Sequence, residues 1–157
     1  MNNPDPLPLR LIAPPPVMYI EALLLGVAIH MLSPISIFSA TPAHEILAGF
    51  LLVLSGAFAR WAFLTMRRLG TTANPKKPSE ALVIDGPFRI SRNPIYVAMT
   101  GLYIGLAFLV NSAWPLILLV PLLMLMQWGV ILREERYLSG KFGSEYTAYS
   151  SRVRRWL

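Results

Sequence analysis

Polar side chains that could bind a ligand gather in two segments of an otherwise apolar chain. The first, residues 82–99, reads LVIDGPFRISRNPIYVAM and combines two arginines with an Asn-Pro step and a tyrosine. The second, residues 133–157, begins with an acidic pair and continues with tyrosines and arginines. Arginine binds carboxylates through paired hydrogen bonds, and carboxylates accept hydrogen bonds from hydroxyl and ammonium groups. If the fold brings the two segments together, they could form one polar pocket.

Four apolar stretches surround these segments: residues 17–38, 44–66, 94–110 and 113–132. Each is close to the roughly 17 to 25 residues that a membrane-spanning helix needs. We therefore expect an all-α integral membrane protein with about four transmembrane helices. Only VNSAW separates the last two stretches, so they should form a tight antiparallel helical hairpin that makes the two polar segments neighbours.

Composition supports the same class. Of the 157 residues, 55% are hydrophobic and 14% are charged, whereas a soluble domain carries about 25% charged residues. The net charge of +6 comes from basic residues that flank the apolar stretches, which favours a membrane surface over nucleic acid as the partner. Without cysteine, and with only two histidines, the chain is expected to have no disulfide, no cysteine nucleophile and no metal site.

The distribution of lysine and arginine predicts the orientation. Residues 67–92 hold six of them and residues 133–155 hold six more, while the loop after the first stretch and the turn after the third hold none. With four spans, the two basic segments lie on one side, which the positive-inside rule makes cytoplasmic. Both termini are then cytoplasmic, and the amphipathic tail should lie along the membrane surface.

Two charged residues, Glu21 and Arg60, fall inside the apolar stretches at similar depths. Ionisable residues within a membrane often mark functional sites. The simpler interpretation is a structural Glu21–Arg60 ion pair. A small four-helix transporter would use Glu21 as its membrane-embedded carboxylate, and this remains an alternative function.

The ordered motifs resemble those of the isoprenylcysteine carboxyl methyltransferase and phospholipid methyltransferase group of integral membrane methyltransferases. The resemblance covers residues 82–153. It rests on the turn at 86–89, an Arg-x-Pro-x-Tyr element at 92–96, the acidic pair, and the ending FGSEYTAYSSRV at 142–153. It implies one membrane domain, 1–157, in which residues 1–16 form an N-terminal segment, 17–66 form two supporting spans and 82–157 form a methyltransferase-like core.

The resemblance implies S-adenosylmethionine as methyl donor. Carried over to the matching positions, the cofactor-binding residues are Arg92, Asn93, Pro94, Tyr96, Glu134 and Glu135. Arg92 could bind the cofactor carboxylate, the two glutamates could accept from its ribose or ammonium group, and the ring of Tyr96 could attract its sulfonium. The family usually has histidine where this chain has Asn93, so a role that needs a titrating imidazole is lost.

The acceptor is expected to be lipidic or prenylated, because the hydrophobic part of such a molecule can enter sideways from the bilayer. If it is a carboxylate, Arg152 could hold it; if it is an amine, Glu145 could take its proton. Arg154 and Arg155 are expected to contact anionic lipid headgroups. Asn93 keeps open a second alternative, a non-catalytic membrane scaffold. The sequence leaves open the acceptor, O- or N-methylation, and the oligomeric state.

Overall fold

The computed structural model describes residues 13–39, 42–70 and 81–157, and every regular element in these ranges is helical. In chain order they are α1 (Pro15–Leu32), α2 (Ala43–Arg68), the 3-10 helix η1 (Gly86–Arg89), α3 (Pro94–Leu109), α4 (Ala113–Met126), the π-helical turn η2 (Gln127–Ile131), α5 (Leu132–Phe142) and α6 (Ser144–Ser150).

Three helices are long and apolar enough to cross a membrane: α1, α2 and the continuous run of α4, η2 and α5 from Ala113 to Phe142. The all-helical prediction is therefore confirmed for the described residues. α3 is apolar but has only 16 residues, so it is shorter than the other three. The fourth apolar stretch, expected at residues 113–132, is the first part of a longer helix. Its helix continues through residues that favour helix, and it stops at Gly143.

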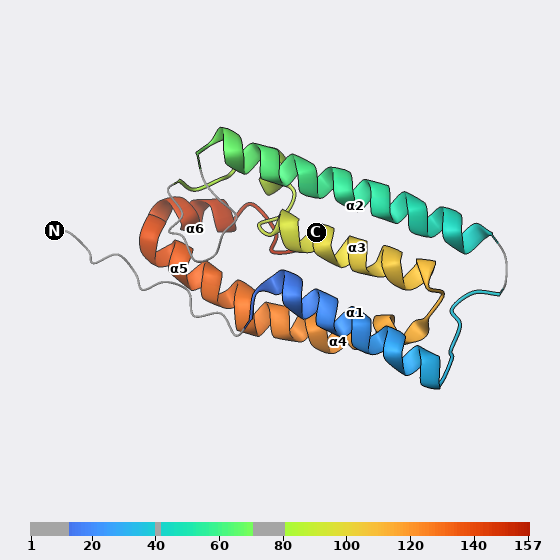
Figure 1. Ribbon diagram of the computed structural model, residues 1–157. Helices are drawn as coiled ribbons and strands as arrows, with labels where there is room; N and C mark the ends of the chain where they lie inside the picture. Colours follow the sequence, from blue (N-terminus) through green and yellow to red (C-terminus); the bar gives the residue numbers. More distant parts are fainter. Residues whose placement is uncertain (1–12, 40–41, 71–80) are drawn as a thin grey trace.

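The predicted tight hairpin of the third and fourth stretches is not the main packing unit. α3 packs chiefly along α2, and α4 packs chiefly along α1 (Figure 1). Small residues explain this pairing, because they let backbones approach closely. A Cβ on Gly101 of α3 would collide with Ser55 of α2, and a Cβ on Gly26 of α1 would lie 2.8 Å from the backbone of Pro115 in α4.

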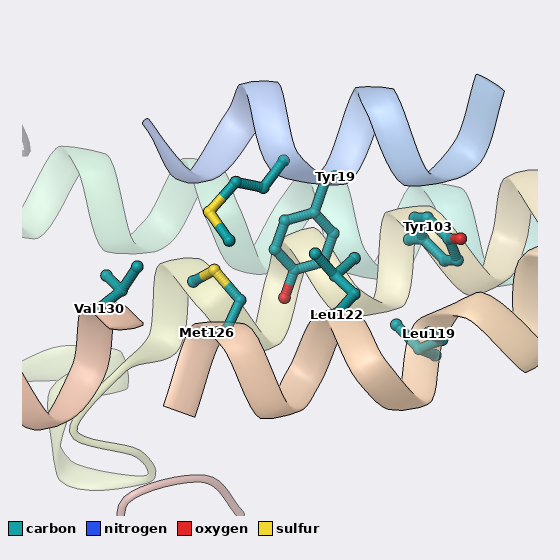
Figure 2. Close-up of a cluster of buried hydrophobic side chains, with 7 residues drawn as sticks. Tyr19, Tyr103, Leu119, Leu122, Met126 and Val130 are labelled. Carbon is teal, nitrogen blue, oxygen red and sulfur yellow. The ribbon is translucent and has the colours of Figure 1, made fainter. Parts of the chain in front are cut away.

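A buried cluster joins the two helix pairs (Figure 2). It contains Met18, Tyr19, Tyr103, Leu119, Leu122, Met126 and Val130. The rings of Tyr19 and Tyr103 meet edge to face at 6.0 Å. Each phenol has a polar partner: the Tyr19 hydroxyl lies 2.8 Å from Thr100 Oγ1, and the Tyr103 hydroxyl donates to the Pro115 carbonyl at 2.8 Å. These partners matter because a buried hydroxyl without a hydrogen bond is costly among apolar side chains.

The predicted Glu21–Arg60 ion pair is wrong for the described structure. Both side chains are exposed, and no ion pair or hydrogen bond joins them within the described ranges. The physical reason is the helix pairing: α1 packs on α4 and α2 on α3, so each charged residue lies on an outward face.

The chain after α5 folds back toward the start of α3. Gly143, with φ of +53°, separates α5 from α6, a conformation that glycine adopts at little cost. α6 then leads the chain back (Figure 1), and the amide of Arg92 donates to the carbonyl of Arg154 at 2.9 Å. The two polar segments are thus brought together, as the sequence predicted.

Candidate functional site

A small cavity of about 100 Å³ lies between the two polar segments. Its polar lining comes from Arg92 and Asn93, which precede α3, and from Glu134 and Glu135 of α5. The other lining residues are Met66, Ala81, Leu82, Val83, Phe88, Leu138, Tyr146 and Tyr149. The structure therefore gathers four of the six predicted cofactor-binding residues around one cavity.

Glu135 is the centre of the charge arrangement. Its Oε1 lies 3.0 Å from Arg92 NH1 and accepts from Arg155 Nε at 2.8 Å, while its Oε2 accepts from Arg155 NH2 at 2.8 Å. The side chains of Glu135 and Arg92 are each only 14% exposed. The hydrogen bonds to Glu135 raise the pKa of the Arg155 guanidinium above its usual value. Two cations on one carboxylate leave the cluster with a positive charge in excess.

One N–H donor of the Arg92 guanidinium has no hydrogen-bond partner. Its Nε is buried and has no hydrogen-bond partner, although NH1 contacts Glu135. A buried donor without a partner is costly in a folded protein and is often a functional feature. Arg92 therefore combines a side chain held by Glu135 with a position in the cavity wall, which suits an anionic ligand group.

The loop before α3 is built to hold these residues in place. Gly86 has φ of +59°, and a Cβ there would lie 2.8 Å from Thr65 Oγ1 of α2, so the loop can pack this closely only with glycine. Ser91 is fully buried, and its Oγ accepts from the Asn93 amide at 3.0 Å. Pro94 is buried at the first position of α3, where proline is well tolerated.

The side chain of Asn93 has a structural partner. Its Nδ2 donates to the carbonyl of Arg155 at 2.9 Å. The position thus needs a hydrogen-bond donor toward the backbone, and a neutral amide supplies it at any pH. The contact role predicted for Asn93 is compatible with this geometry, since the residue also lines the cavity.

Tyr96 lies behind the cavity wall. Its hydroxyl donates to Glu134 Oε1 at 2.7 Å, and its ring packs against the buried cluster of Figure 2. Neither Tyr96 nor Pro94 is among the described residues that line the cavity. In this geometry Tyr96 holds Glu134, and Pro94 fixes the start of the helix that carries Tyr96.

Two tyrosines of α6 complete the wall, and the sequence-based site did not include them. Tyr146 and Tyr149 are both 5% exposed, and the Tyr149 hydroxyl donates to the Phe88 carbonyl at 2.7 Å. Burial raises the pKa of both phenols, and the nearby negative charge of Glu135 adds to the shift at Tyr146. Both are therefore neutral at physiological pH. Their three-residue spacing, which puts them on one helix face, was the available signal.

The two predicted catalytic residues lie elsewhere. Glu145 is exposed on α6, and Arg152 is exposed with its Nε donating to the Ala148 carbonyl at 3.0 Å. Neither lines the cavity described above. Arg155, in contrast, was expected at lipid headgroups, and it is instead bound to Glu135. Its partner lies 20 residues away on α5, whereas Arg155 itself follows the last helix, so local sequence gave no indication of the pair.

The described residues form two larger hollows besides this cavity. An outer groove of about 570 Å³ shares Arg92, Glu135 and Tyr146 with it and also includes Trp128 and Arg136. An apolar groove of about 590 Å³ lies between α2 and α3. It is lined by Leu54, Ser55, Phe58, Ile90, Val97, Ala98, Thr100, Gly101, Ile104, Trp156 and Leu157.

Comparison with known proteins gives two findings. A model of the phospholipid methyltransferase family matches residues 43–145, from the start of α2 into α6. An uncharacterized protein of Haemophilus influenzae is 63% identical over 27 residues, which is 17% of this chain and 43% of that protein. The chain thus spans less than half the length of this relative.

Proposed function

This chain belongs to the phospholipid methyltransferase family, and on that premise we propose that it is a membrane methyltransferase that uses S-adenosylmethionine to methylate a lipidic or prenylated acceptor. The observation that carries the proposal is the cavity between α3, α5 and α6, where Arg92, Asn93, Glu134 and Glu135 meet. All four lie within the matched residues. The match also includes α2.

The residues around the cavity fit the chemistry of the cofactor. The guanidinium of Arg92, which lines the cavity, can donate to its carboxylate, and Glu134 and Glu135 can accept from its ammonium or ribose hydroxyls. The neutral ring of Tyr146 offers an aromatic face to a cation. When bound, S-adenosylmethionine supplies a methyl group activated by a positively charged sulfur.

The size of the cavity implies a rearrangement on binding. Its volume of about 100 Å³ is below the roughly 300 to 1,000 Å³ of small-molecule sites. The outer groove of about 570 Å³ shares Arg92, Glu135 and Tyr146 with it. Movement of these shared side chains would join the two spaces, and Glu135 would exchange one of its guanidinium partners for the ligand.

The protein would contribute to the reaction by aligning the two reactants and by keeping water out of the cavity. Methyl transfer is a displacement at carbon, for which alignment of the two reactants and exclusion of water are the main contributions of an enzyme. Met66, Val83, Phe88 and Leu138 give the cavity apolar walls. After Glu135 has exchanged one guanidinium partner for the ligand, its remaining ion pair would hold the polar side chains in place, so that little reorganisation is needed during transfer.

The apolar groove between α2 and α3 supports a lipidic acceptor. Its lining is apolar except for Ser55 and Thr100, and the Thr100 hydroxyl already donates to the Tyr96 carbonyl at 2.9 Å. A hydrocarbon chain lying there would end near the cavity, because Trp156 of the groove directly follows Arg155, which binds Glu135. Arg152 for a carboxylate acceptor and Glu145 for an amine remain the proposed groups at the acceptor's polar end.

The proposal places the cavity and both termini on the cytoplasmic side, where the soluble cofactor can enter. It is tested by isothermal titration of detergent-purified protein with S-adenosylmethionine and S-adenosylhomocysteine. Micromolar binding by the wild type, lost in the Glu134→Gln, Glu135→Gln double variant, is the expected result. Glu45→Gln, which removes an exposed carboxylate at the start of α2, is the matched control. Absence of binding by folded wild type would favour the non-catalytic scaffold.

A further inference from the structure

The backbone carbonyls of Arg154 and Arg155 accept three hydrogen bonds from the loop before α3. The carbonyl of Arg154 accepts from the Arg92 amide at 2.9 Å. The carbonyl of Arg155 accepts from Asn93 Nδ2 at 2.9 Å and from Ser91 Oγ at 3.2 Å. Since Ser91 is fully buried, this attachment is shielded from water and rigid.

The indole of Trp156 is held on two sides. Its ring N–H donates to Gln127 Oε1 of η2 at 3.1 Å. The preceding residue, Arg155, is bound through two hydrogen bonds to Glu135 of α5. A side chain fixed in this way cannot swing aside freely to admit a larger neighbour.

Trp156 forms part of the apolar groove wall, and it directly follows Arg155, which is hydrogen-bonded to the cavity residues Asn93 and Glu135. The floor of that groove is equally fixed, because Gly101 of α3 packs directly on Ser55 of α2. The exposed part of the groove lies between a candidate membrane span, α2, and the apolar helix α3, so its mouth meets lipid. A hydrocarbon chain is the occupant that matches this lining, since a polar group would find no free partner on Thr100.

We propose that Trp156 is the specificity-determining residue of this groove: its indole sets the width of the hydrocarbon chain that can lie between α2 and α3 with its polar end at the cavity. The identity of the occupant as methyl acceptor rests on the proposed function. The size limit itself rests on the fixed indole and the close Gly101–Ser55 contact. Removing the indole would widen the groove at the end where the chain approaches the cavity.

The test uses two photoreactive fatty acids, one with a linear 16-carbon chain and one with a methyl-branched chain, each carrying a diazirine. The full-length protein is placed in phospholipid nanodiscs and irradiated, and the labelled residues are mapped by mass spectrometry. The readout is the ratio of branched to linear labelling on groove residues such as Phe58 and Ile104. Binding of S-adenosylhomocysteine is measured on the same preparations.

For Trp156→Ala, we expect the ratio to rise about tenfold, the lower end of what one methylene in an apolar pocket discriminates. Trp156→Phe, which keeps a ring but removes the N–H, should raise it less and serves if the alanine variant does not fold. The matched control is Trp114→Ala, which removes another indole that hydrogen-bonds a neighbouring element, the Ser33 carbonyl at 2.6 Å, but lies away from the groove. Its ratio should equal that of the wild type.

An unchanged ratio in both Trp156 variants would overturn the proposal. It would also be overturned if the linear probe labelled the groove no more than Val53, which faces outward from α2. Loss of S-adenosylhomocysteine binding in every preparation would contradict the proposed function. A Trp156-dependent ratio in those same preparations would still establish the groove as a size-selective hydrocarbon site.

Discussion

The hydroxyl of Tyr96 lies 2.7 Å from Glu134 Oε1, and this contact ties α3 to α5 beside the cavity. The neighbouring glutamate is held separately, because Glu135 contacts Arg92 and Arg155. Two adjacent carboxylates thus have different partners, one neutral phenol and two cations. Each glutamate is fixed by a residue at or before the start of α3, so the loop and the acidic pair form one unit.

Tyr96→Phe should weaken cofactor binding while the fold is kept. It removes one hydrogen bond to a carboxylate, which is worth about 1.5–3 kcal/mol, so we expect the dissociation constant of S-adenosylhomocysteine to rise about tenfold or more. Calorimetric titration measures this. Tyr103→Phe removes a buried phenol contact at Pro115, away from the cavity, and should leave the affinity unchanged; an equal loss in both variants would refute the role of Tyr96.

Arg155→Gln should cost both stability and affinity. The Glu135 side chain is 14% exposed and that of Arg155 is 33% exposed. With Glu135 keeping only Arg92, the loss of stability should therefore lie between the roughly 1 kcal/mol of an exposed pair and the roughly 3 kcal/mol of a buried one. Arg155→Lys should fall in between, since an ammonium does not reproduce the two parallel hydrogen bonds. Denaturant unfolding in detergent measures the change.

The control for Arg155 is Arg89→Gln. Arg89 and Asp85 also form an ion pair, at 2.6 Å, but their side chains are 75% and 54% exposed. Exposed pairs contribute about 0–1 kcal/mol, so this variant should unfold like the wild type. Comparable losses in the two variants would show that Arg155 acts only as surface charge.

Gly101→Ala should destabilise the α2–α3 pair, because the added Cβ collides with Ser55. Overpacking of this kind costs about 1–3 kcal/mol. Ser55→Gly should recover part of that loss in the double variant, and the thermal midpoints of the four proteins give the coupling. Gly56→Ala, where a Cβ would meet nothing within 4 Å, should be neutral or stabilising. Additive effects of Gly101→Ala and Ser55→Gly would argue against the contact.

Strong alkali should unfold the protein through its buried phenols. Burial raises the pKa of Tyr149 in the folded state, so folding favours the protonated form. The associated stability is complete below the unfolded value of about 10 and is lost as pH rises above it. We expect the thermal midpoint to fall between pH 9 and pH 11 in the wild type, and to fall less in Tyr149→Phe. If the thermal midpoints of the wild type and of Tyr149→Phe fall equally with pH, Tyr149 does not contribute to the loss of stability in alkali.

The sequence predicted the helical class from the length of its apolar stretches, and it predicted the meeting of the two polar segments from the short connection between the third and fourth stretches. The segments do meet, but they do so through the returning tail, whose Arg154 and Arg155 carbonyls accept hydrogen bonds from Arg92 and Asn93. The sequence did not predict the helix pairing. The short turn between α3 and α4 suggested that they pack together, whereas Gly101 and Gly26 direct each helix to another partner. Arg155 was missed for a related reason: its contact depends on how α6 turns the chain back, which no local pattern encodes.

The π-helical turn at Gln127–Ile131 divides the long helix into two parts. It rotates the side-chain faces of the second part about the helix axis relative to those of the first. One residue corresponds to about 100° of rotation in an α-helix, and a wide turn accommodates such an insertion without breaking the rod. The lipid-facing side of α4 and the cavity-facing side of α5 are therefore phased separately. The turn thus lets one continuous helix present an apolar side to lipid at α4 and the Glu134–Glu135 pair to the cavity at α5.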